Sequence, residues 1–588
     1  MKKMRQWVMA ATLICGLSVF TACSSSDDDD DPVATGTTEK ELLYQWIADY
    51  AEQSTDTLTS DLYDRVVKVY EFFDDGTGYY EHYLLKGDEL VYACNLRGEN
   101  GDFEYTVSND KVTIKLADIY GENDSTWTVS CANYALTDPD GKAFRHSTEA
   151  EREQVMAWYE SWHGGSAEGT IDLSTVKGNI TVKDGSVLTG KLGPYTIAID
   201  NGATVTLHNV DINDAQAHNA PIVTGAIVCK GDVTIILSGT NKVCGYTVAD
   251  LIGTSNGIDV PENKTLTIKG DGELEIRGGK HGAGIGSSST PFSKYQAGNL
   301  VIESGTIKAY GGFGCPGIGG GYASGSPMGN ITIKGGNVSA FGGEKAAGIG
   351  GGIKTPCGNI TINGGNVYAM GGAYGAGVGA GNFKGSCGDI TITGGRVDGT
   401  GGQYGAGIGS ACSEKEEDGN IAGRYRSITI TGGEVVGTAG EDAAGIGTGY
   451  VLSGPRYDSR TITITGGWVW GIGRGRGVGI GAGMDGVCGT ININTSSGNY
   501  LNVEAKSEKL NDISSISIGA TLSQYMGTLN LCTGFRLYCF DYPNTEWSWI
   551  RNTENFVSKI REARYVMLRT CDHPGYESNP AACIWCKH

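Results

Sequence analysis

Residues 330–336 read Asn-Ile-Thr-Ile-Lys-Gly-Gly, and almost the same stretch returns at 359–365 and again at 389–395. The second copy reads Asn-Ile-Thr-Ile-Asn-Gly-Gly and the third reads Asp-Ile-Thr-Ile-Thr-Gly-Gly. Looser copies begin at Leu300, Ile428 and Ile462. The copies follow one another about every 30 residues, and a repeat of that length is typical of a solenoid.

Each repeat contains two further short apolar segments. One lies around Ile307, Val338, Val367, Val397, Val435 and Val469, and the other is a Gly-Ile-Gly step at Ile285, Ile318, Ile349, Val378, Ile408, Ile446 and Ile480. Three short strands separated by Gly-Gly corners suit one coil of a parallel β-helix, in which equivalent residues stack about 4.8 Å apart. Alternation places Ile331 and Ile333 inside and Thr332 outside. We therefore expect a mainly β protein with a long right-handed parallel β-helix over residues 166–499.

The composition agrees with this repeat and excludes other classes. Glycine provides 94 of the 588 residues and proline only 13, without a Gly-X-Y period, which excludes collagen. Hydrophobic residues at 39% argue against disorder. The formal net charge is −21, so the surface repels phosphate and we exclude nucleic acid as a partner.

The N-terminus carries a targeting signal. A basic segment at residues 2–5 precedes an apolar segment, 7–22, which is too short to span a bilayer comfortably. It ends Phe20-Thr21-Ala22-Cys23, which resembles the lipobox of bacterial lipoproteins, although Phe20 replaces the usual Leu or Val. The resemblance implies that Cys23 is lipidated after cleavage.

The acidic run at residues 27–31 resembles the export tag of surface lipoproteins in Bacteroidota-type bacteria. We therefore expect a signal peptide at 1–22 and a lipidated cysteine with an acidic tether at 23–38. These features imply a surface-exposed protein of the outer membrane, attached to the membrane only by its lipid. The alternatives are an uncleaved membrane anchor and an ordinary acidic linker.

Residues 39–165 are predicted to form a separate small domain. Short alternating runs separated by tight-turn signals favour an antiparallel meander or barrel, and residues 149–162 favour a short amphipathic helix. The order of Leu43-Tyr44-Gln45-Trp46 and later strands ending at Thr126-Trp127 resembles the lipocalin-like domains of Bacteroidota lipoproteins. Such a barrel either holds an apolar ligand or is filled and acts as a spacer.

The Gly-Ile-Gly and Ile-Thr-Ile-x-Gly-Gly repeats resemble those of large surface proteins of gut bacteria. Residues 226–241 also look like the β-helical carbohydrate-binding domain family. The resemblance implies a β-helix and, more loosely, carbohydrate binding.

The C-terminal part is predicted to be a small cap at 500–570, since an open β-helix end invites aggregation. The tail at 571–588 is rich in cysteine and histidine. Four or five soft ligands suit a structural tetrahedral Zn²⁺ site, and a disulfide is the competing interpretation. The candidate metal ligands are Cys571, His573, Cys583, Cys586 and His588.

Aromatic residues recur at outward positions of the repeat. Exposed rings on a rigid flat face suit the apolar faces of sugars, so these residues are the candidate binding strip. They are Tyr310, Phe341, Tyr368, Tyr374, Tyr404, Trp468 and Trp470. The alternative for each is stacking between coils or cover by a partner domain.

Two cysteines, Cys357 and Cys387, precede equivalent isoleucines in neighbouring coils. This register brings them within disulfide reach, and a ladder of reduced thiols is the alternative that we favour.

No catalytic constellation emerges from the sequence. Carboxylates do not recur across coils as they would for the acidic cluster of β-helical pectin-cleaving enzymes, and no nucleophile triad or phosphate loop is present. We therefore expect non-catalytic binding of extracellular polysaccharide or host glycan, or adhesion, through the β-helix face. The alternatives are a β-helical polysaccharide lyase or glycoside hydrolase, and a structural stalk or host-contact protein.

Overall fold

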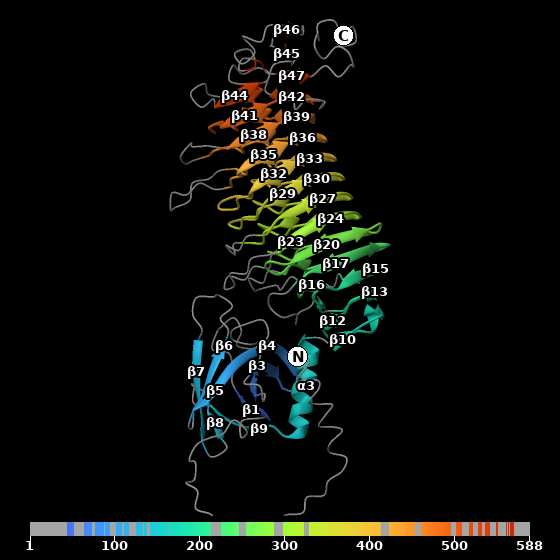
Figure 1. The fold of residues 1–588 in the computed structure, drawn as a ribbon, viewed down its shortest axis with the longest axis vertical. Coiled ribbons are helices and arrows are strands. Elements are labelled where there is room, and N and C mark those ends of the chain that lie inside the picture. The colour runs from blue at the N-terminus through green and yellow to red at the C-terminus, as the bar shows by residue number, and fades with distance from the viewer. Residues whose placement is uncertain are drawn as a thin grey trace, which may run out of the picture. The chain divides into compact units, whose positions relative to one another are not determined.

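The protein is mainly β, with 52% strand and 4% helix, and it contains a long parallel β-solenoid and a small antiparallel sheet near the N-terminus (Figure 1). Both parts of this fold were predicted from the sequence. The predicted leader and tether at 1–38 and the tail at 571–588 lie outside the described residues. The computed structural model describes residues 44–51, 64–72, 77–87, 89–94, 102–108, 111–116, 125–132, 135–137, 142–163, 165–193, 195–212, 225–245, 255–286, 298–322, 328–412, 423–452, 460–494, 501–507, 517–520, 527–531, 536–540, 548–550, 560, 563 and 565–569.

The N-terminal sheet has the order β2-β1-β9-β8-β7-β6-β5-β3-β4, and β2 also pairs with β3, which closes this order into a ring. Aromatic side chains fill its core: the ring of Tyr70 lies 4.3 Å from that of Tyr80 and 5.1 Å from that of Phe144. The strands are β1 (Tyr44–Ala51), β2 (Arg65–Phe72), β3 (Thr77–Lys86), β4 (Glu89–Cys94), β5 (Asp102–Ser108), β6 (Lys111–Leu116), β7 (Ser125–Ala132), β8 (Ala135–Thr137) and β9 (Ala143–His146).

The one long helix among the described residues is α3 (Glu149–His163). It begins with a capping box, because the Glu151 backbone N–H donates to the Thr148 hydroxyl while the Thr148 N–H donates to the Glu151 carboxylate. These two bonds satisfy donors that have no partner inside the helix, so they set its first residue.

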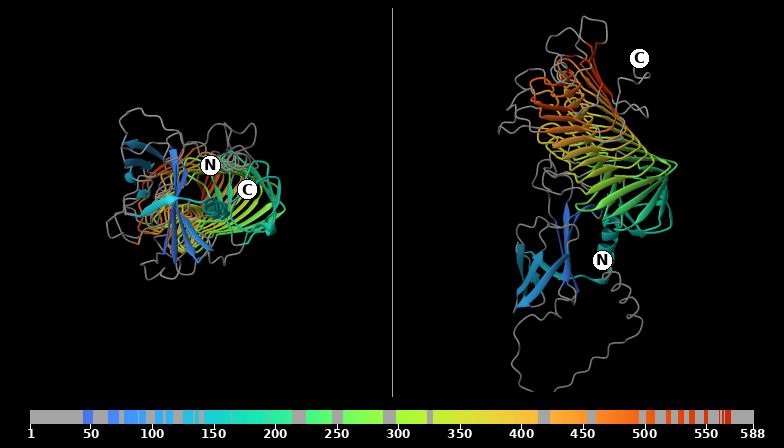
Figure 2. Two further views of the ribbon diagram at one scale, coloured as in Figure 1. Left: turned by 90° about the horizontal axis from the view of Figure 1, so that it is seen from below. Right: turned by 45° about the horizontal axis from the view of Figure 1, so that its top comes forward.

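The solenoid is built from three ladders of parallel strands, which we call ladders 1, 2 and 3. Ladder 1 contains the Gly-Ile-Gly steps, ladder 2 the Ile-Thr-Ile segments and ladder 3 the Val-centred segments. Figure 2 shows the successive coils lying over one another. Ladder 1 consists of β10 (Gly165–Ala167), β12 (Ile180–Val182), β14 (Ile197–Ile199), β16 (Ile227–Cys229), β19 (Ile258–Asp259), β22 (Ile285–Gly286), β25 (Ile318–Gly319), β28 (Ile349–Gly350), β31 (Val378–Gly379), β34 (Ile408–Gly409), β37 (Ile446–Gly447), β40 (Ile480–Gly481) and β43 (Ile518–Gly519).

Ladders 2 and 3 are both introduced by the strands β11 (Thr170–Asp172), β13 (Val187–Lys191) and β15 (Thr204–Ile212), and β15 pairs with the first strand of each. Ladder 2 then consists of β17 (Val233–Ser238), β20 (Thr265–Gly270), β23 (Asn299–Ile302), β26 (Ile331–Ile333), β29 (Ile360–Ile362), β32 (Asp389–Ile392), β35 (Ser427–Ile430), β38 (Thr461–Ile464), β41 (Thr490–Ile493) and β44 (Thr528–Leu531). Ladder 3 consists of β18 (Thr240–Cys244), β21 (Glu273–Arg277), β24 (Thr306–Tyr310), β27 (Asn337–Phe341), β30 (Asn366–Met370), β33 (Arg396–Thr400), β36 (Glu434–Thr438), β39 (Gly467–Gly473) and β42 (Leu501–Ser507).

Alternation along each strand separates the core from the surface. Ile331 pairs with Ile360 and Ile333 with Ile362, and all four side chains are fully buried. Thr332 pairs with Thr361 between them and is partly exposed. The predicted inside and outside positions are therefore confirmed, and the core is a continuous column of stacked aliphatic side chains.

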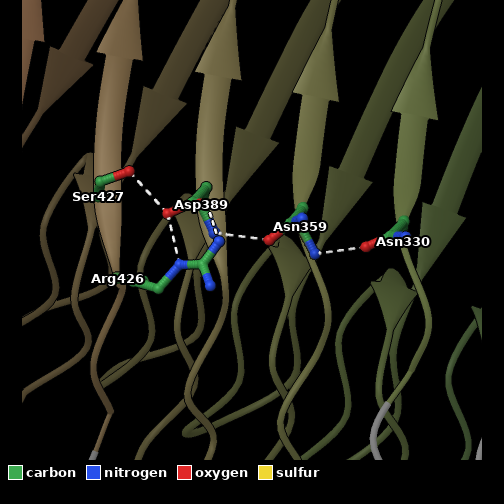
Figure 3. A network of polar contacts seen from close by, with 5 residues as sticks. All are labelled: Asn330, Asn359, Asp389, Arg426 and Ser427. Atoms are coloured by element: carbon green, nitrogen blue, oxygen red, sulfur yellow. Dashed lines mark hydrogen bonds and ion pairs between the residues drawn. The ribbon is translucent and has the colours of Figure 1, made fainter.

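Polar side chains at the beginning of successive ladder 2 strands, β26, β29, β32 and β35, fix the register between coils (Figure 3). The Asn330 side-chain oxygen accepts a hydrogen bond from the Asn359 backbone N–H at 2.9 Å, and the Asn359 side chain does the same for Asp389. Asp389 then accepts from Arg426 and Ser427 of the next coil. These four coils are thus bonded to one another by side chains as well as by their strands.

The solenoid extends further than the repeat predicts. β42, β43 and β44 still pair in parallel with the preceding coil, so the ladders pass the boundary that we expected at residue 499. The final coil keeps the strand register although it lacks the Gly-Gly corner that marks the repeat. At the other end, Gly165 pairs with Ile180 and Ile180 with Ile197, so the first coils are shorter than 30 residues.

Antiparallel strands follow the last coil. β47 (Tyr565–Arg569) pairs with β42 of ladder 3 and with β45 (Arg536–Phe540), which in turn pairs with β46 (Ser548–Ile550). The pairing with β47 occupies the edge of β42, so that edge is not left open.

Candidate functional site

Three of the predicted binding residues form a stack on the outer face of ladder 3. The rings of Tyr310 and Phe341 lie 4.9 Å apart and only 11° from parallel, and Phe341 lies 5.8 Å from Tyr368. On the other side of Tyr310 lies the Arg277 guanidinium, 4.1 Å from the ring centre. Each ring therefore faces a neighbour, and the stack stabilises adjacent coils more than it offers faces to a ligand.

Trp468 and Trp470 are arranged differently. They lie two residues apart on β39, so both project from the same face of ladder 3 at a separation of about 7 Å along the strand. Their exposed fractions are 48% and 38%. Among the described residues no aromatic side chain of an adjacent coil pairs with either tryptophan, since ladder 3 places Glu434 and Asn502 beside Trp468, and Val436 and Glu504 beside Trp470.

On the two coils that precede the tryptophans, the outer face of ladder 3 is polar and contains an ion pair. Arg396 of β33 forms an ion pair with Glu434 of β36 at 3.1 Å. Asp398 lies between Tyr368 and Val436 on the ladder, and partial burial raises the pKa of its carboxyl group. Hydrogen-bonding side chains thus lie one and two coils away from the tryptophans.

The remaining two predicted residues, Tyr374 and Tyr404, lie on another surface. There each ladder 1 strand from β28 to β40 follows a glycine-rich corner and precedes a loop. The loop donates a backbone hydrogen bond to the corner of the preceding coil. The bonds run from Ile353 to Gly314, Asn382 to Lys345, Cys412 to Tyr374, Tyr450 to Tyr404 and Met484 to Asp442, at 2.7–3.0 Å. We call these corners and loops the rim: residues 278–284, 311–317, 320–322, 342–348, 351–357, 371–377, 380–387, 401–407, 410–412, 439–445, 448–452, 473–479 and 482–488.

The rim carries aromatic residues that the sequence did not single out. Tyr404 lies 5.7 Å from Tyr374 and 5.9 Å from Tyr450, with the rings tilted by 42° and 50°. Nearer the N-terminal end, His281, Phe313 and Tyr322 contact one another. The sequence does contain a signal for two of them, because Tyr322 and Tyr450 both lie four residues after the isoleucine of a Gly-Ile-Gly step.

Comparison with known proteins supports the repeat. Residues 300–322, 331–353 and 360–382 each match the family model described as "Beta helix repeat". The chain is a parallel β-helix protein. No curated protein and no solved structure matches it.

The matched segments of this β-helix protein begin on ladder 2 and end on the rim. Each contains one strand of every ladder and the beginning of the loop that follows ladder 1, so the family model spans the three strands of a coil. β-Helix repeats of this kind fit a polysaccharide-binding or lyase-like protein.

The cysteines of the β-helix core are free thiols. Cys357 and Cys387 are both buried, and the Cys357 thiol and burial raise the pKa of the Cys387 thiol. The structure therefore contains the thiol ladder rather than the disulfide. In the part of the chain that the structure describes, no group of three histidine, cysteine or acidic residues is placed to hold a metal ion. The predicted zinc ligands and Cys23 lie outside that part.

Other carboxylates of the β-helix are held in ion pairs. Arg426 hydrogen-bonds to Asp389 and lowers the pKa of its carboxyl group, while Arg476 lies 3.2 Å from Asp442. A pocket lined by Tyr425, Arg460 and Cys488 is too narrow to admit a water molecule. None of the described helices is long and apolar enough to cross a membrane.

Proposed function

We propose that the protein is a lipid-anchored protein of the bacterial cell surface and binds extracellular polysaccharide through the outer face of ladder 3. The observation that carries this proposal is the exposure of Trp468 and Trp470 side by side on a rigid strand. Burying two exposed indole rings removes a large apolar area from water, and a sugar ring offers the flat apolar face that covers them.

The surroundings of the pair support a sugar as the ligand. Glu434, one coil before Trp468, and Arg396, two coils before it, supply paired polar groups that suit the hydroxyl groups of a carbohydrate. The sheet that carries them is bonded coil to coil, so little ordering cost arises on binding.

The test is binding of the full chain to a panel of immobilised plant, microbial and host polysaccharides. We expect the double variant W468A/W470A to lose at least tenfold in affinity for the glycan that binds, because each lost aromatic contact costs about 1 kcal/mol or more. Met370 is a matched control, since it is 42% exposed on the same face but carries no ring. The variant M370A should bind as the native chain does.

Two outcomes would contradict the proposal. If no glycan binds, polysaccharide binding is wrong. If W468A/W470A binds as well as M370A, the site is wrong. Release of reducing or unsaturated sugar ends during incubation would instead establish the alternative, a β-helical hydrolase or lyase.

A further inference from the structure

The rim is a separate surface with its own charge. In a chain with a formal net charge of −21, the described rim between residues 278 and 387 contains four lysines and a single carboxylate. They are Lys280, Glu344, Lys345, Lys354 and Lys384. At physiological salt, exposed charges are screened beyond a distance of about 8 Å. The nearby lysines therefore determine the potential at this part of the rim, which attracts anions although the chain as a whole is acidic.

The lysines are placed among the rim's aromatic rings. The Lys345 ammonium lies 5.3 Å from the centre of the Tyr374 ring and 5.2 Å from that of Phe383, and the Lys354 ammonium lies 5.8 Å from Phe383. Neither lysine forms an ion pair with a carboxylate of the described residues. Their charges are therefore available to a ligand that also contacts the rings.

The backbone of the rim is strained where these side chains occur. Of the seven non-glycine residues with positive φ in the described structure, five lie on the rim, among them Lys345 at 70°, Lys354 at 57° and Phe383 at 54°. Glycine adopts this conformation without cost, and Gly314 occupies the position of Lys345 one coil earlier at 72°. A lysine or phenylalanine there costs about 1–2 kcal/mol. Strain of this kind concentrates at functional sites, where the side chain itself is needed.

We propose that the rim from Lys280 to Tyr404 binds an anionic polysaccharide lying along the solenoid axis. Its carboxylate or sulfate groups pair with Lys345 and Lys354, and its sugar rings lie against Phe383 and Tyr374. The neighbouring ring of Tyr404 lies 5.7 Å from Tyr374 along the axis, so the contacts repeat from coil to coil. This site is independent of the tryptophan pair on ladder 3.

The test uses the strained lysines themselves. The double variant K345G/K354G removes both ammonium groups and relieves the positive-φ strain, so its thermal unfolding midpoint should stay close to that of the native chain. Titration calorimetry with polygalacturonate tests the carboxylate form of the ligand, and heparin tests the sulfate form. We expect the variant to lose at least tenfold in affinity for whichever polymer binds, and the native affinity to fall as salt rises.

Matched controls separate the charges from other effects. N263G changes a positive-φ residue outside the rim, and K308A removes an exposed lysine from ladder 3; both should bind as the native chain does. W468A/W470A should also keep its affinity for the anionic polymer, which distinguishes this site from the proposed function. Equal affinity for fully methyl-esterified pectin, full affinity in K345G/K354G, or failure of both polyanions to bind would overturn the proposal.

Discussion

At the scale of single residues, Asp259 departs from the repeat. It stands on ladder 1 where the following strands carry Gly286 and Gly319, and its carboxylate is buried. One oxygen accepts from the Gly225 backbone N–H and the other from the Asn256 amide. Burial is the larger effect and raises the pKa of Asp259 to about 7.

This pKa predicts how stability depends on pH. Between about pH 4 and pH 7 the folded chain keeps a proton on Asp259 that the unfolded chain releases, so the free energy of unfolding falls as pH rises through this window. Each unit of the shift corresponds to about 1.4 kcal/mol. The variant D259N should lose this part of the pH dependence, measured by urea unfolding from pH 4 to pH 8. The exposed D271N serves as control, and a D259N profile parallel to the native one would contradict the prediction.

At the scale of the strand and its corner, glycine is required for two different reasons that can be measured apart. Gly395 and Gly202 have nearly the same φ, +81° and +79°. A Cβ on Gly395 would lie 2.5 Å from the Gly365 carbonyl oxygen of the preceding coil, whereas one on Gly202 meets nothing within 4 Å. We expect G202A to lower the free energy of unfolding by about 1–2 kcal/mol, the cost of the left-handed backbone. G395A should cost clearly more, because the coils must also move apart. Equal losses in urea unfolding would show that close approach is unimportant.

The sequence predicts the elements that depend on periodicity and misses those that depend on contacts between loops. Alternation placed Ile331 and Ile333 inside, since burial on one face of a strand leaves a period of two. The rim could not be predicted, because its hydrogen bonds join backbone groups of different coils, as from Asn382 to Lys345. For the same reason the sequence grouped Tyr310 with Trp468 as one strip, although the former is stacked and the latter is exposed.

At the scale of the whole molecule, the end of the solenoid determines whether it stays separate from other copies. Val566 and Leu568 of β47 are fully buried, and Met567 between them is partly exposed. The double variant V566D/L568D should detach β47 and expose the edge of β42, which would then pair with other chains. Light scattering should show concentration-dependent association for this variant and none for the matched control M567D. A monomeric V566D/L568D would show that β47 does not protect the edge.

The hydrogen bonds of the rim have a consequence for how such a molecule changes over generations. The bonds from a loop to a corner, such as that from Asn382 to Lys345, reach only the coil before, so a duplicated coil brings its own partners and lengthens the solenoid by about 4.8 Å. Segments as alike as 330–336 and 359–365 are natural points for unequal recombination. The number of lysine and aromatic residues that can contact a polymer therefore increases or decreases by whole coils. The avidity for that polymer would change in this way while each single contact stays the same.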